Sequence, residues 1–348
     1  MVSYFPKRIK AIYDFARSKL LVRCNPKRGA NPTMKLLIIR PSALGDTLML
    51  MPSIDQLRGS AEIVLVGRSP GIDLISAYVN RVIDYEGSGW HRLFLENPGA
   101  DPPLSLPQAD CTVAFLSDPE ETVNRNLKTA LPKTSLHFFP AFPPEEASLH
   151  AAFYLAQCLK QAGMPVDPDK CLAEADQRAL LKSGGQAIQK EGPVFHPGSG
   201  GKGKNHPPEF WIQLIRKFHT RFPSPSFSKP IILLGPAEEQ LHPFFTREVG
   251  GGRTAILFAP ELEQLQSILT QAPFYVGHDS GITHLAAMLG TPTIALFRNT
   301  PVHQWRPLGP AVRVLENEVN PQTIIAKVLE EAGKYVGRQY LGSTPRAT

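Results

Sequence analysis

Residues 274–287 read FYVGHDSGITHLAA, a short apolar run followed by a polar turn with one glycine and then by a second apolar stretch. The run Phe274–Gly277 has the length and composition of a buried strand, and the stretch after the turn has those of a helix. A strand that passes through a turn into a helix is the repeating unit of parallel sheets with helical crossovers. This segment therefore predicts an α/β fold.

The same alternation of short apolar runs and longer amphipathic stretches continues in both directions from this segment. In the second half of the chain we expect further strands at Pro193–His196, Ile231–Gly235, Ala255–Ala259, Thr293–Phe297 and Ala311–Leu315. In the first half we expect strands at Lys35–Arg40, Glu62–Gly67, Arg81–Tyr85 and Cys111–Leu116. Gly45–Arg58 has the pattern of the first crossover helix.

The 348 residues exceed the usual size of one hydrophobic core, so we expect two domains. The predicted division is an N-terminal extension at 1–33, a Rossmann-like domain at 34–185, a second Rossmann-like domain at 186–335 and a tail at 336–348. Doubly wound sheets bind ligands outside the carboxyl ends of their strands. Two such domains facing one another predict a cleft that holds the active site.

The net charge of +6 is concentrated in residues 1–33, which hold eight lysines and arginines and one aspartate, so that the rest of the chain sums to −1. The near-neutral body gives no reason to expect nucleic-acid binding. In 1–33 cations alternate with apolar residues at helical spacing, as in a helix on an anionic membrane surface. Two alternatives stay open: a helix packed on the body, or a start codon chosen too far upstream.

Neither a metal site nor a membrane span is indicated by the sequence. The four cysteines have no zinc-like or disulfide spacing, and there is no run of about 18 apolar residues. Asp167-Pro-Asp169 spells the DxD of metal-dependent sugar transferases, but it lies in the expected break between domains rather than after a strand. We interpret that match as chance and expect no metal and no cofactor.

A first candidate motif, RPSALGDT at 40–47, directly follows the first strand. Gly45 permits a tight turn, so Asp46 is expected at the start of the next helix, where its carboxylate can accept a proton from an approaching hydroxyl. The helix dipole favours the ionised form of such a group. The alternative is that Asp46 is an ordinary N-cap.

A second motif, FHPGSGGKGKNHP at 195–207, also lies between a strand and a helix. Its glycines let backbone N–H groups approach an anion, and Lys202 and Lys204 add positive charge. Gly198–Lys204 matches the first part of a phosphate-binding P-loop, but Asn205 stands where the P-loop has Ser or Thr. A solvated glycine-rich turn is the alternative.

The turn in 274–287 is the third motif. Asp279 and Ser280 can cap the following helix, whose free N–H groups suit a diphosphate, and Gly281 lets that group come close. Thr283 and His284 are expected to point a hydroxyl and an imidazole toward the same place. A packing role for His284 is the alternative.

These three motifs in this order, together with Leu233–Glu239 and the segment after 293–297, resemble glycosyltransferase family 9, the lipopolysaccharide heptosyltransferases. The resemblance extends over about Met34–Gly309. It implies the GT-B fold, transfer with inversion and chemistry that requires no metal. It also implies a nucleotide-diphosphate sugar as donor, for which we expect ADP-heptose.

Residue by residue, the resemblance makes Asp46 the catalytic base and Lys204 the cation that neutralises the donor phosphates. Glu239, or alternatively its neighbour Glu238, matches an acid that holds the nucleotide ribose. The other residues expected to bind substrate are Ser42, Gly45, Thr47, Ser199, Gly200, Asp279, Ser280, Gly281, Thr283, His284 and Arg298.

The chain also departs from the family pattern. Ser280 stands where that family usually has Thr, His206 occupies the usual Trp position, and Arg298-Asn299 replaces Gly-Pro. These departures leave the identity of the sugar open, and Arg298 is a candidate for recognising a different donor group.

The sequence thus predicts an enzyme that transfers a sugar to lipopolysaccharide core or another lipid-linked acceptor, at the cytoplasmic face of the inner membrane. Acceptor recognition is expected in loops at 87–110 and 119–144. The alternatives are a P-loop-like NTPase or kinase that uses 198–204, and a catalytically degenerate homologue that only binds nucleotide-sugar.

Overall fold

The structure is a computed structural model that describes residues 34–87, 89–96, 104–118, 120–144, 147–183, 192–223, 229–249, 252–316 and 320–341. The basic segment 1–33, for which we expect membrane binding, lies outside these residues. In the described part of the chain, no helix is long and apolar enough to cross a membrane.

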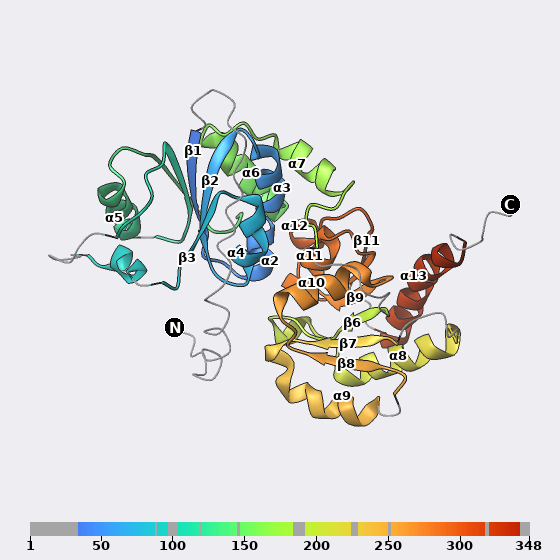
Figure 1. Ribbon diagram of the computed structural model, residues 1–348. Coiled ribbons are helices and arrows are strands. Elements are labelled where there is room, and N and C mark those ends of the chain that lie inside the picture. Colours follow the sequence, from blue (N-terminus) through green and yellow to red (C-terminus); the bar gives the residue numbers. More distant parts are fainter. Residues whose placement is uncertain are drawn as a thin grey trace. The chain divides into compact units, whose positions relative to one another are not determined.

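The first half of the described chain, coloured blue to green in Figure 1, forms a five-stranded parallel sheet in the order β3-β2-β1-β4-β5. Its strands are β1 (Met34–Ile39), β2 (Ala61–Gly67), β3 (Arg81–Asp84), β4 (Cys111–Phe115) and β5 (Ser135–Phe139). Its helices are α2 (Leu44–Leu48), α3 (Met51–Leu57), α4 (Gly71–Ile75), α5 (Thr122–Ala130), α6 (Ala151–Gln161) and α7 (Pro168–Ala175), with 3-10 turns η2 (Ser76–Tyr78) and η3 (Trp90–Phe94). The strand order reverses between β1 and β4, so the loop after β1 is a natural ligand site.

The second half forms a six-stranded parallel sheet in the order β11-β10-β9-β6-β7-β8. Its strands are β6 (Val194–His196), β7 (Ile231–Leu234), β8 (Ala255–Phe258), β9 (Tyr275–His278), β10 (Thr293–Phe297) and β11 (Val312–Glu316). Its helices are α8 (Pro208–Arg221), α9 (His242–Glu248), α10 (Leu262–Gln271), α11 (Gly281–Met288), α12 (Val302–Trp305) and α13 (Pro321–Leu341), with 3-10 turns η5 (Lys202–Lys204) and η6 (Pro236–Leu241). Here the order reverses between β6 and β9, the two strands that precede the second and third motifs.

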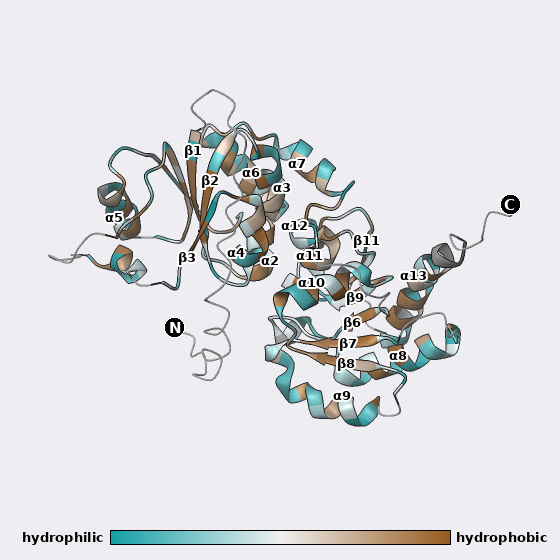
Figure 2. Ribbon diagram, viewed as in Figure 1, coloured by the Kyte–Doolittle hydropathy of each residue, from teal (hydrophilic) through white to brown (hydrophobic). Residues whose placement is uncertain are grey.

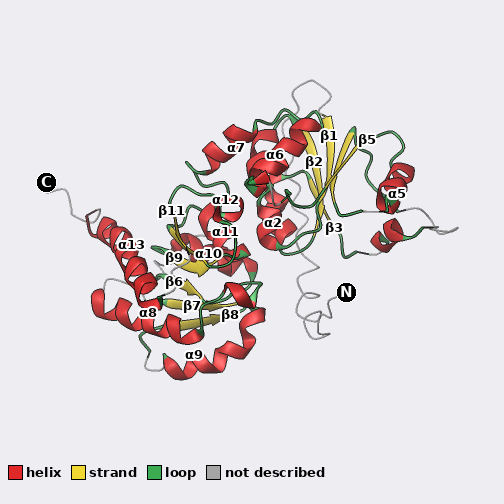
Figure 3. Cartoon of the chain, turned by 180° about the vertical axis from the view of Figure 1, so that it is seen from behind, coloured by secondary structure: helices red, strands yellow, loops and turns green. Residues whose placement is uncertain are grey.

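Buried apolar side chains cover both faces of each sheet, as expected for strands enclosed by helices. Figure 3 shows the strands between layers of helices. On one face of the second sheet, Trp211 of α8 and Phe245 of α9 pack with α13. On the other face, residues of α10 and α11 join a cluster that continues into the first half of the chain through α6 and α7. Figure 2 shows the resulting pattern, with apolar strands inside and polar surfaces on the outer helices.

The first crossover helix differs from the prediction. Gly45–Arg58 is not one helix, because the chain forms α2 and then α3, with Met49 and Leu50 as a turn between them. Pro52 near the start of α3 has no N–H with which to continue the hydrogen bonds of α2. The break makes α2 a short element that carries the first motif.

The segment 119–144 also differs from the prediction, because it is not only a loop. Its described residues include the helix α5 and the edge strand β5. The predicted loop at 87–110 contains η3, which the side chain of Asn126 fixes by donating to the carbonyls of Leu93 at 3.0 Å and Leu95 at 2.9 Å.

Candidate active site

The site is built where the starts of α2 and α11 touch. A β-carbon added to Gly281 would lie 2.9 Å from the side chain of Leu44 and 3.0 Å from the backbone nitrogen of Gly45. One added to Gly45 would lie 3.2 Å from Cδ2 of His284. The two glycines therefore allow a close approach of the first and third motifs. Gly281 packs against α2 here, whereas the sequence predicted that it leaves room for a phosphate group.

Asp46 is the third residue of α2 and is partly buried at this contact. The N-cap of the helix is Ala43, which makes no side-chain capping bond, so Asp46 is not the ordinary N-cap that its sequence also allowed. Burial raises the pKa of Asp46, and the nearby Arg40 and His284 oppose that rise. A carboxylate with a raised pKa is a stronger base than an exposed one.

Arg40 is a site residue that our sequence reasoning passed over, although it opens the first motif. It is 1% exposed, donates from Nε to the carbonyl of Asp46 at 3.2 Å and from Nη1 to the carbonyl of Ala141 at 2.7 Å. Its guanidinium also lies over the rings of Phe115 and Phe142. Burial lowers the pKa of Arg40 to about 10, so the side chain stays cationic at neutral pH. The sequence signal that could have identified Arg40 is an arginine placed directly after a buried strand.

Ser42 and Thr47 lie in the same turn and contact one another. The Thr47 hydroxyl lies 3.3 Å from that of Ser42 and donates to the Ser42 carbonyl at 3.3 Å. Thr47 is fully buried, whereas Ser42 is partly exposed. These hydroxyls thus fix the turn that presents Asp46.

Lys204 and Asp279 form an ion pair between the second and third motifs. Lys204 Nζ lies 2.6 Å from Asp279 Oδ2, and the two side chains are 39% and 7% exposed. Burial would raise the pKa of Asp279, but His284 and Lys204 outweigh it and lower that pKa to about 2. Asp279 is therefore ionised and holds Lys204 at the start of α11 rather than capping the helix.

The second motif does not have the geometry of a P-loop. Lys204 ends the 3-10 turn η5, and α8 begins only at Pro208, so no helix N-terminus follows the lysine directly. Ser199 donates within the segment, to Oδ1 of Asn205 at 2.6 Å, and Gly200 is exposed with open space around it. The glycine-rich segment is thus fixed by its own polar groups.

The third motif uses its polar residues in different ways. Ser280 is the N-cap of α11 and accepts from the Thr283 amide at 3.3 Å. Thr283 is fully buried, and its hydroxyl donates to the His278 carbonyl and contacts the Tyr275 hydroxyl at 3.0 Å. The Thr283 hydroxyl is therefore turned into the protein, away from the expected diphosphate.

His284 is buried between the two carboxylates of the site. Its Nε2 lies 3.6 Å from Oδ1 of Asp279, and its ring contacts Gly45 in the turn before Asp46. Within the described residues its Nδ1 is buried and has no hydrogen-bond partner. The His284 imidazole thus lies near Asp279 on one side of the contact between α2 and α11 and near Asp46 on the other.

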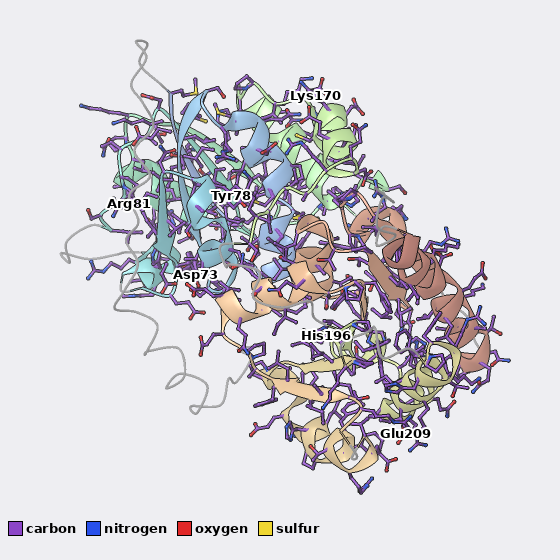
Figure 4. The ribbon with its side chains drawn as sticks, turned by 45° about the vertical axis from the view of Figure 1, so that its right-hand side comes forward. Asp73, Tyr78, Arg81, Lys170, His196 and Glu209 are labelled. Atoms are coloured by element: carbon purple, nitrogen blue, oxygen red, sulfur yellow. The ribbon has the colours of Figure 1, made fainter. Side chains whose placement is uncertain are left out.

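A buried polar chain runs beneath the glycine-rich segment. Tyr275 contacts Nδ1 of His196 at 3.0 Å, and Nε2 of His196 lies 3.9 Å from Oε2 of Glu238. Figure 4 shows His196 inside the second half, whereas Glu209 of α8 lies at its surface. Burial lowers the pKa of His196 to about 4, so the ring is neutral at physiological pH.

Glu238, rather than Glu239, is the acid that adjoins the second motif. Glu239 is exposed, whereas Glu238 is 7% exposed and accepts from the Gly235 amide at 2.8 Å. A β-carbon at Gly198 would overlap the Glu238 carboxyl group. Burial raises the pKa of Glu238. The sequence could not separate two neighbouring glutamates, because only their place in η6 decides which is buried.

Arg298 lies at the end of β10 and reaches the same segment. It is exposed, and its Nη1 donates to the carbonyl of Asn205. The structure thus uses at least one of its nitrogens for the protein itself rather than for a donor sugar.

The DxD match is a helix cap. Asp167 is the N-cap of α7 and accepts from the amides of Asp169 and Lys170 at 3.1 and 3.2 Å. Among the described residues, no group of three or more His, Cys, Asp or Glu side chains is arranged to hold a metal ion.

The family model of glycosyltransferase family 9 (heptosyltransferase) matches residues 142–334, which contain Lys204 and Asp279. The chain belongs to this family. The matched range holds the second and third motifs of the site but begins after Asp46. No curated protein sequence matches the chain.

Solved structures of family 9 proteins share the fold of this chain. Escherichia coli heptosyltransferase WaaC with ADP matches at a TM-score of 0.61 and 17% identity, over 86% of this chain and 100% of that chain. The family 9 protein of Veillonella parvula matches at 0.63 and 17%, over 91% and 100%. Escherichia coli ADP-heptose lipopolysaccharide heptosyltransferase II matches at 0.63 and 16%, over 88% and 100%. The expected GT-B fold is confirmed.

Proposed function

We propose that this family 9 chain is an inverting glycosyltransferase that moves a heptose from ADP-heptose to a lipid-linked saccharide such as lipopolysaccharide core. The observation that carries the proposal is that Asp46 in α2 lies close to His284 in α11 and to the Lys204–Asp279 pair, whose members follow β6 and β9. A base and an anion-binding group beside one another are what a direct displacement on a sugar needs.

Asp46 has the properties of the base. Its pKa is raised by burial, yet the nearby Arg40 and His284 favour its ionised form. In the proposed reaction the acceptor hydroxyl loses its proton to the Asp46 carboxylate as its oxygen bonds to the anomeric carbon. The bond between that carbon and the diphosphate oxygen breaks on the opposite face, so the configuration inverts once and ADP leaves.

Lys204 and the start of α11 suit the leaving diphosphate. Negative charge develops on the bridging oxygen as the bond breaks, and fixed donors aimed at that charge stabilise the transition state. Lys204 supplies a cation that is 39% exposed. Because the Thr283 amide already donates to the Ser280 cap, the amides of Gly281 and Ile282 are the candidate donors from this helix start. Ser280 is partly exposed at this helix start and is a further candidate donor.

The relatives support the proposed donor. Escherichia coli WaaC structures contain ADP and ADP-2-deoxy-2-fluoro heptose, and the glycine-rich segment of this chain can approach the diphosphate of such a donor. We propose that Glu238 or Glu239, in η6 after β7, contacts the nucleotide ribose. The reaction is proposed to need neither a metal nor a cofactor.

Charge and family membership support the proposed acceptor and location. We propose that the eight cations of residues 1–33 bind anionic lipid at the cytoplasmic face of the inner membrane, where a lipid-linked saccharide is available. The enzyme would then be a peripheral membrane protein.

Two measurements test the proposed function. First, nucleotides are compared by thermal shift, where a ligand at 100 times its dissociation constant adds about 2.7 kcal/mol of stability. We expect ADP to stabilise the protein more than UDP or GDP. Second, purified protein is incubated with ADP-heptose and a lipopolysaccharide-core acceptor, and the anomer of the product is determined. Binding of ADP without transfer would indicate a degenerate homologue, and magnesium-dependent release of phosphate from ATP would indicate an NTPase.

A further inference from the structure

The residues that depart from the family pattern after β6 and β10 either lie in one segment or contact it. We call residues 197–206, which follow β6 and contain Lys204, the donor loop. Asn299 Nδ2 donates to the Gly203 carbonyl at 2.8 Å, and Arg298 donates to the Asn205 carbonyl. His206, at the end of the donor loop, stacks on Phe210 with 4.2 Å between ring centroids. These departures thus share one physical task, which is to hold the donor loop.

His278, the last residue of β9, holds both ends of the donor loop with one ring. Its Nδ1 lies 3.0 Å from the carbonyl of Pro197 at the start of the loop. Its Nε2 lies 2.9 Å from the backbone nitrogen of His206 and 3.0 Å from Nδ1 of His206, at the end of the loop. The ring is fully buried and packs edge-on against Trp211.

The hydrogen-bond pattern fixes the proton positions of both histidines. A backbone N–H can only donate, so Nε2 of His278 must be an acceptor and carries no proton. A carbonyl can only accept, so Nδ1 of His278 carries the proton and donates to Pro197. Nε2 of His278 has a single lone pair, which already accepts from the His206 amide, so Nδ1 of His206 can meet it only as a second donor that shares this lone pair. Burial and the neighbouring His206 lower the pKa of His278 to about 3, which keeps the ring neutral as this pattern requires.

We propose that His278 is a positioning residue that ties the two ends of the donor loop together and thereby sets the place of Lys204. The next residue along the chain is Asp279, whose Oδ2 accepts a hydrogen bond from Lys204 Nζ at 2.6 Å. One strand end therefore closes the loop and also accepts the lysine that the loop carries. The expected effect of His278 on ADP binding rests on the proposed function, whereas its closure of the donor loop does not.

The proton positions are tested first, without any activity. Long-range proton–nitrogen NMR spectra of the full chain distinguish the two neutral forms of a histidine. We expect both His278 and His206 to carry the proton on Nδ1. Protonation of His278 on Nε2 would overturn the proposal, because that nitrogen could then not accept from the His206 amide.

The loop closure is tested with two substitutions at the same position. His278→Gln keeps an acceptor and a donor on one planar amide, whereas His278→Leu keeps neither. Amide hydrogen exchange in 198–206 should be faster in His278→Leu than in His278→Gln, which should stay near wild type. Equal exchange in the two variants would overturn the proposal. His219→Leu, which removes a histidine of α8 bonded to Thr254, is the control and should leave the donor loop unchanged.

The link to Lys204 is tested by a double-mutant cycle. His278→Leu should raise the dissociation constant of ADP about tenfold, the effect of losing two hydrogen bonds of ordinary strength. In a Lys204→Met background the same change should have little further effect, because its action passes through the lysine. Fully additive effects would show that His278 acts only on packing. If wild type bound ADP but transferred no sugar, the proposed function would fail while this cycle would still decide the role of His278.

Discussion

Replacing Lys204 by Met is the sharpest test of the site, because it removes the charge and keeps most of the aliphatic chain. The Lys204 side chain runs past Gly201, where a β-carbon would lie 3.6 to 3.7 Å from Cγ, Cδ and Cε. Met can preserve that packing, so the main loss is the ammonium group that lies 2.6 Å from Asp279. Two effects follow, one on stability and one on the reaction.

The effect on stability can be derived from the pKa of Asp279, which is about 2 against an ordinary value of 3.8. That difference corresponds to about 2 kcal/mol at neutral pH, since one pH unit equals 1.36 kcal/mol. His284 and Lys204 share it, and the Lys204 side chain is 39% exposed to screening, so we assign Lys204 about 1 kcal/mol. A lowered carboxyl pKa stabilises the fold above the unfolded pKa, near 4, and this contribution disappears as the pH falls through about 2. Lys204→Met should therefore be less stable by about 1 kcal/mol at pH 7, with a gap that narrows below pH 4.

The effect on the reaction is expected to be larger. A charged donor on the leaving diphosphate contributes about 10²-fold to turnover, and its loss should also weaken donor binding. Urea unfolding at pH 7, 4 and 3 measures the first effect, and steady-state kinetics with ADP titration measures the second. If the folded variant kept its ADP affinity and turnover within about threefold of wild type, Lys204 would have no part in the site. An unfolding gap that stayed constant with pH would show instead that the pair with Asp279 is not formed.

Four other predictions concern the base, the pH dependence that it causes, the contact between α2 and α11, and metal. Asp46→Asn should lower kcat/KM by about 10²–10⁴-fold and leave ADP affinity unchanged, and unchanged turnover would exclude Asp46 as the base. Because burial raises the pKa of Asp46 and only the carboxylate accepts a proton, the wild-type kcat/KM should rise with pH through a value above that of an ordinary aspartate. Gly281→Ala should lower the melting temperature and the activity, because the new β-carbon meets Leu44 at 2.9 Å, whereas Gly333→Ala meets Phe222 at an ordinary 3.7 Å and should be tolerated. Finally, turnover measured in a chelator should equal turnover in magnesium, and loss of activity that a metal restores would contradict the proposed mechanism.

The strands were predictable because central strands of parallel sheets are buried on both faces and therefore read as continuous apolar runs. Leu36–Ile39 in β1 and Thr293–Phe297 in β10 are fully buried runs of this kind. The edge strand β5, Ser135–Phe139, is only half-buried and includes a serine and a histidine, so its sequence resembles a loop. The break between α2 and α3 was missed because the apolar pattern continues across it, although Pro52 marked the place.

Site residues could be predicted from the sequence where a charged residue follows a strand in a glycine-containing turn. Asp46 and Lys204 follow strands in glycine-containing turns, and the structure places both near the start of α11. The orientation of Thr283 was not predictable, because a hydroxyl in a helix's first turn can bond either a ligand or its own strand. His278 was missed because a histidine at the end of a buried strand has no pattern that shows which groups its two nitrogens meet. Only the fold brings Pro197 and His206 to its ring.

Gly45 and Gly281 show most clearly why the function of a turn depends on tertiary structure. Both glycines were explained from the sequence by needs within their own motifs, a tight turn for one and an approaching phosphate for the other. Neither has a positive φ angle, so backbone conformation does not require glycine at these positions. A β-carbon at Gly281 would lie 2.9 Å from Leu44, and one at Gly45 would lie 3.2 Å from His284, so the two glycines let the starts of α2 and α11 approach closely. Asp46 follows Gly45 directly, next to the place where Gly45 meets His284, and burial raises its pKa. A side chain at Gly281, 235 positions after Asp46 in the sequence, would press against Leu44 and Gly45 and force apart the two helix starts beside the proposed base.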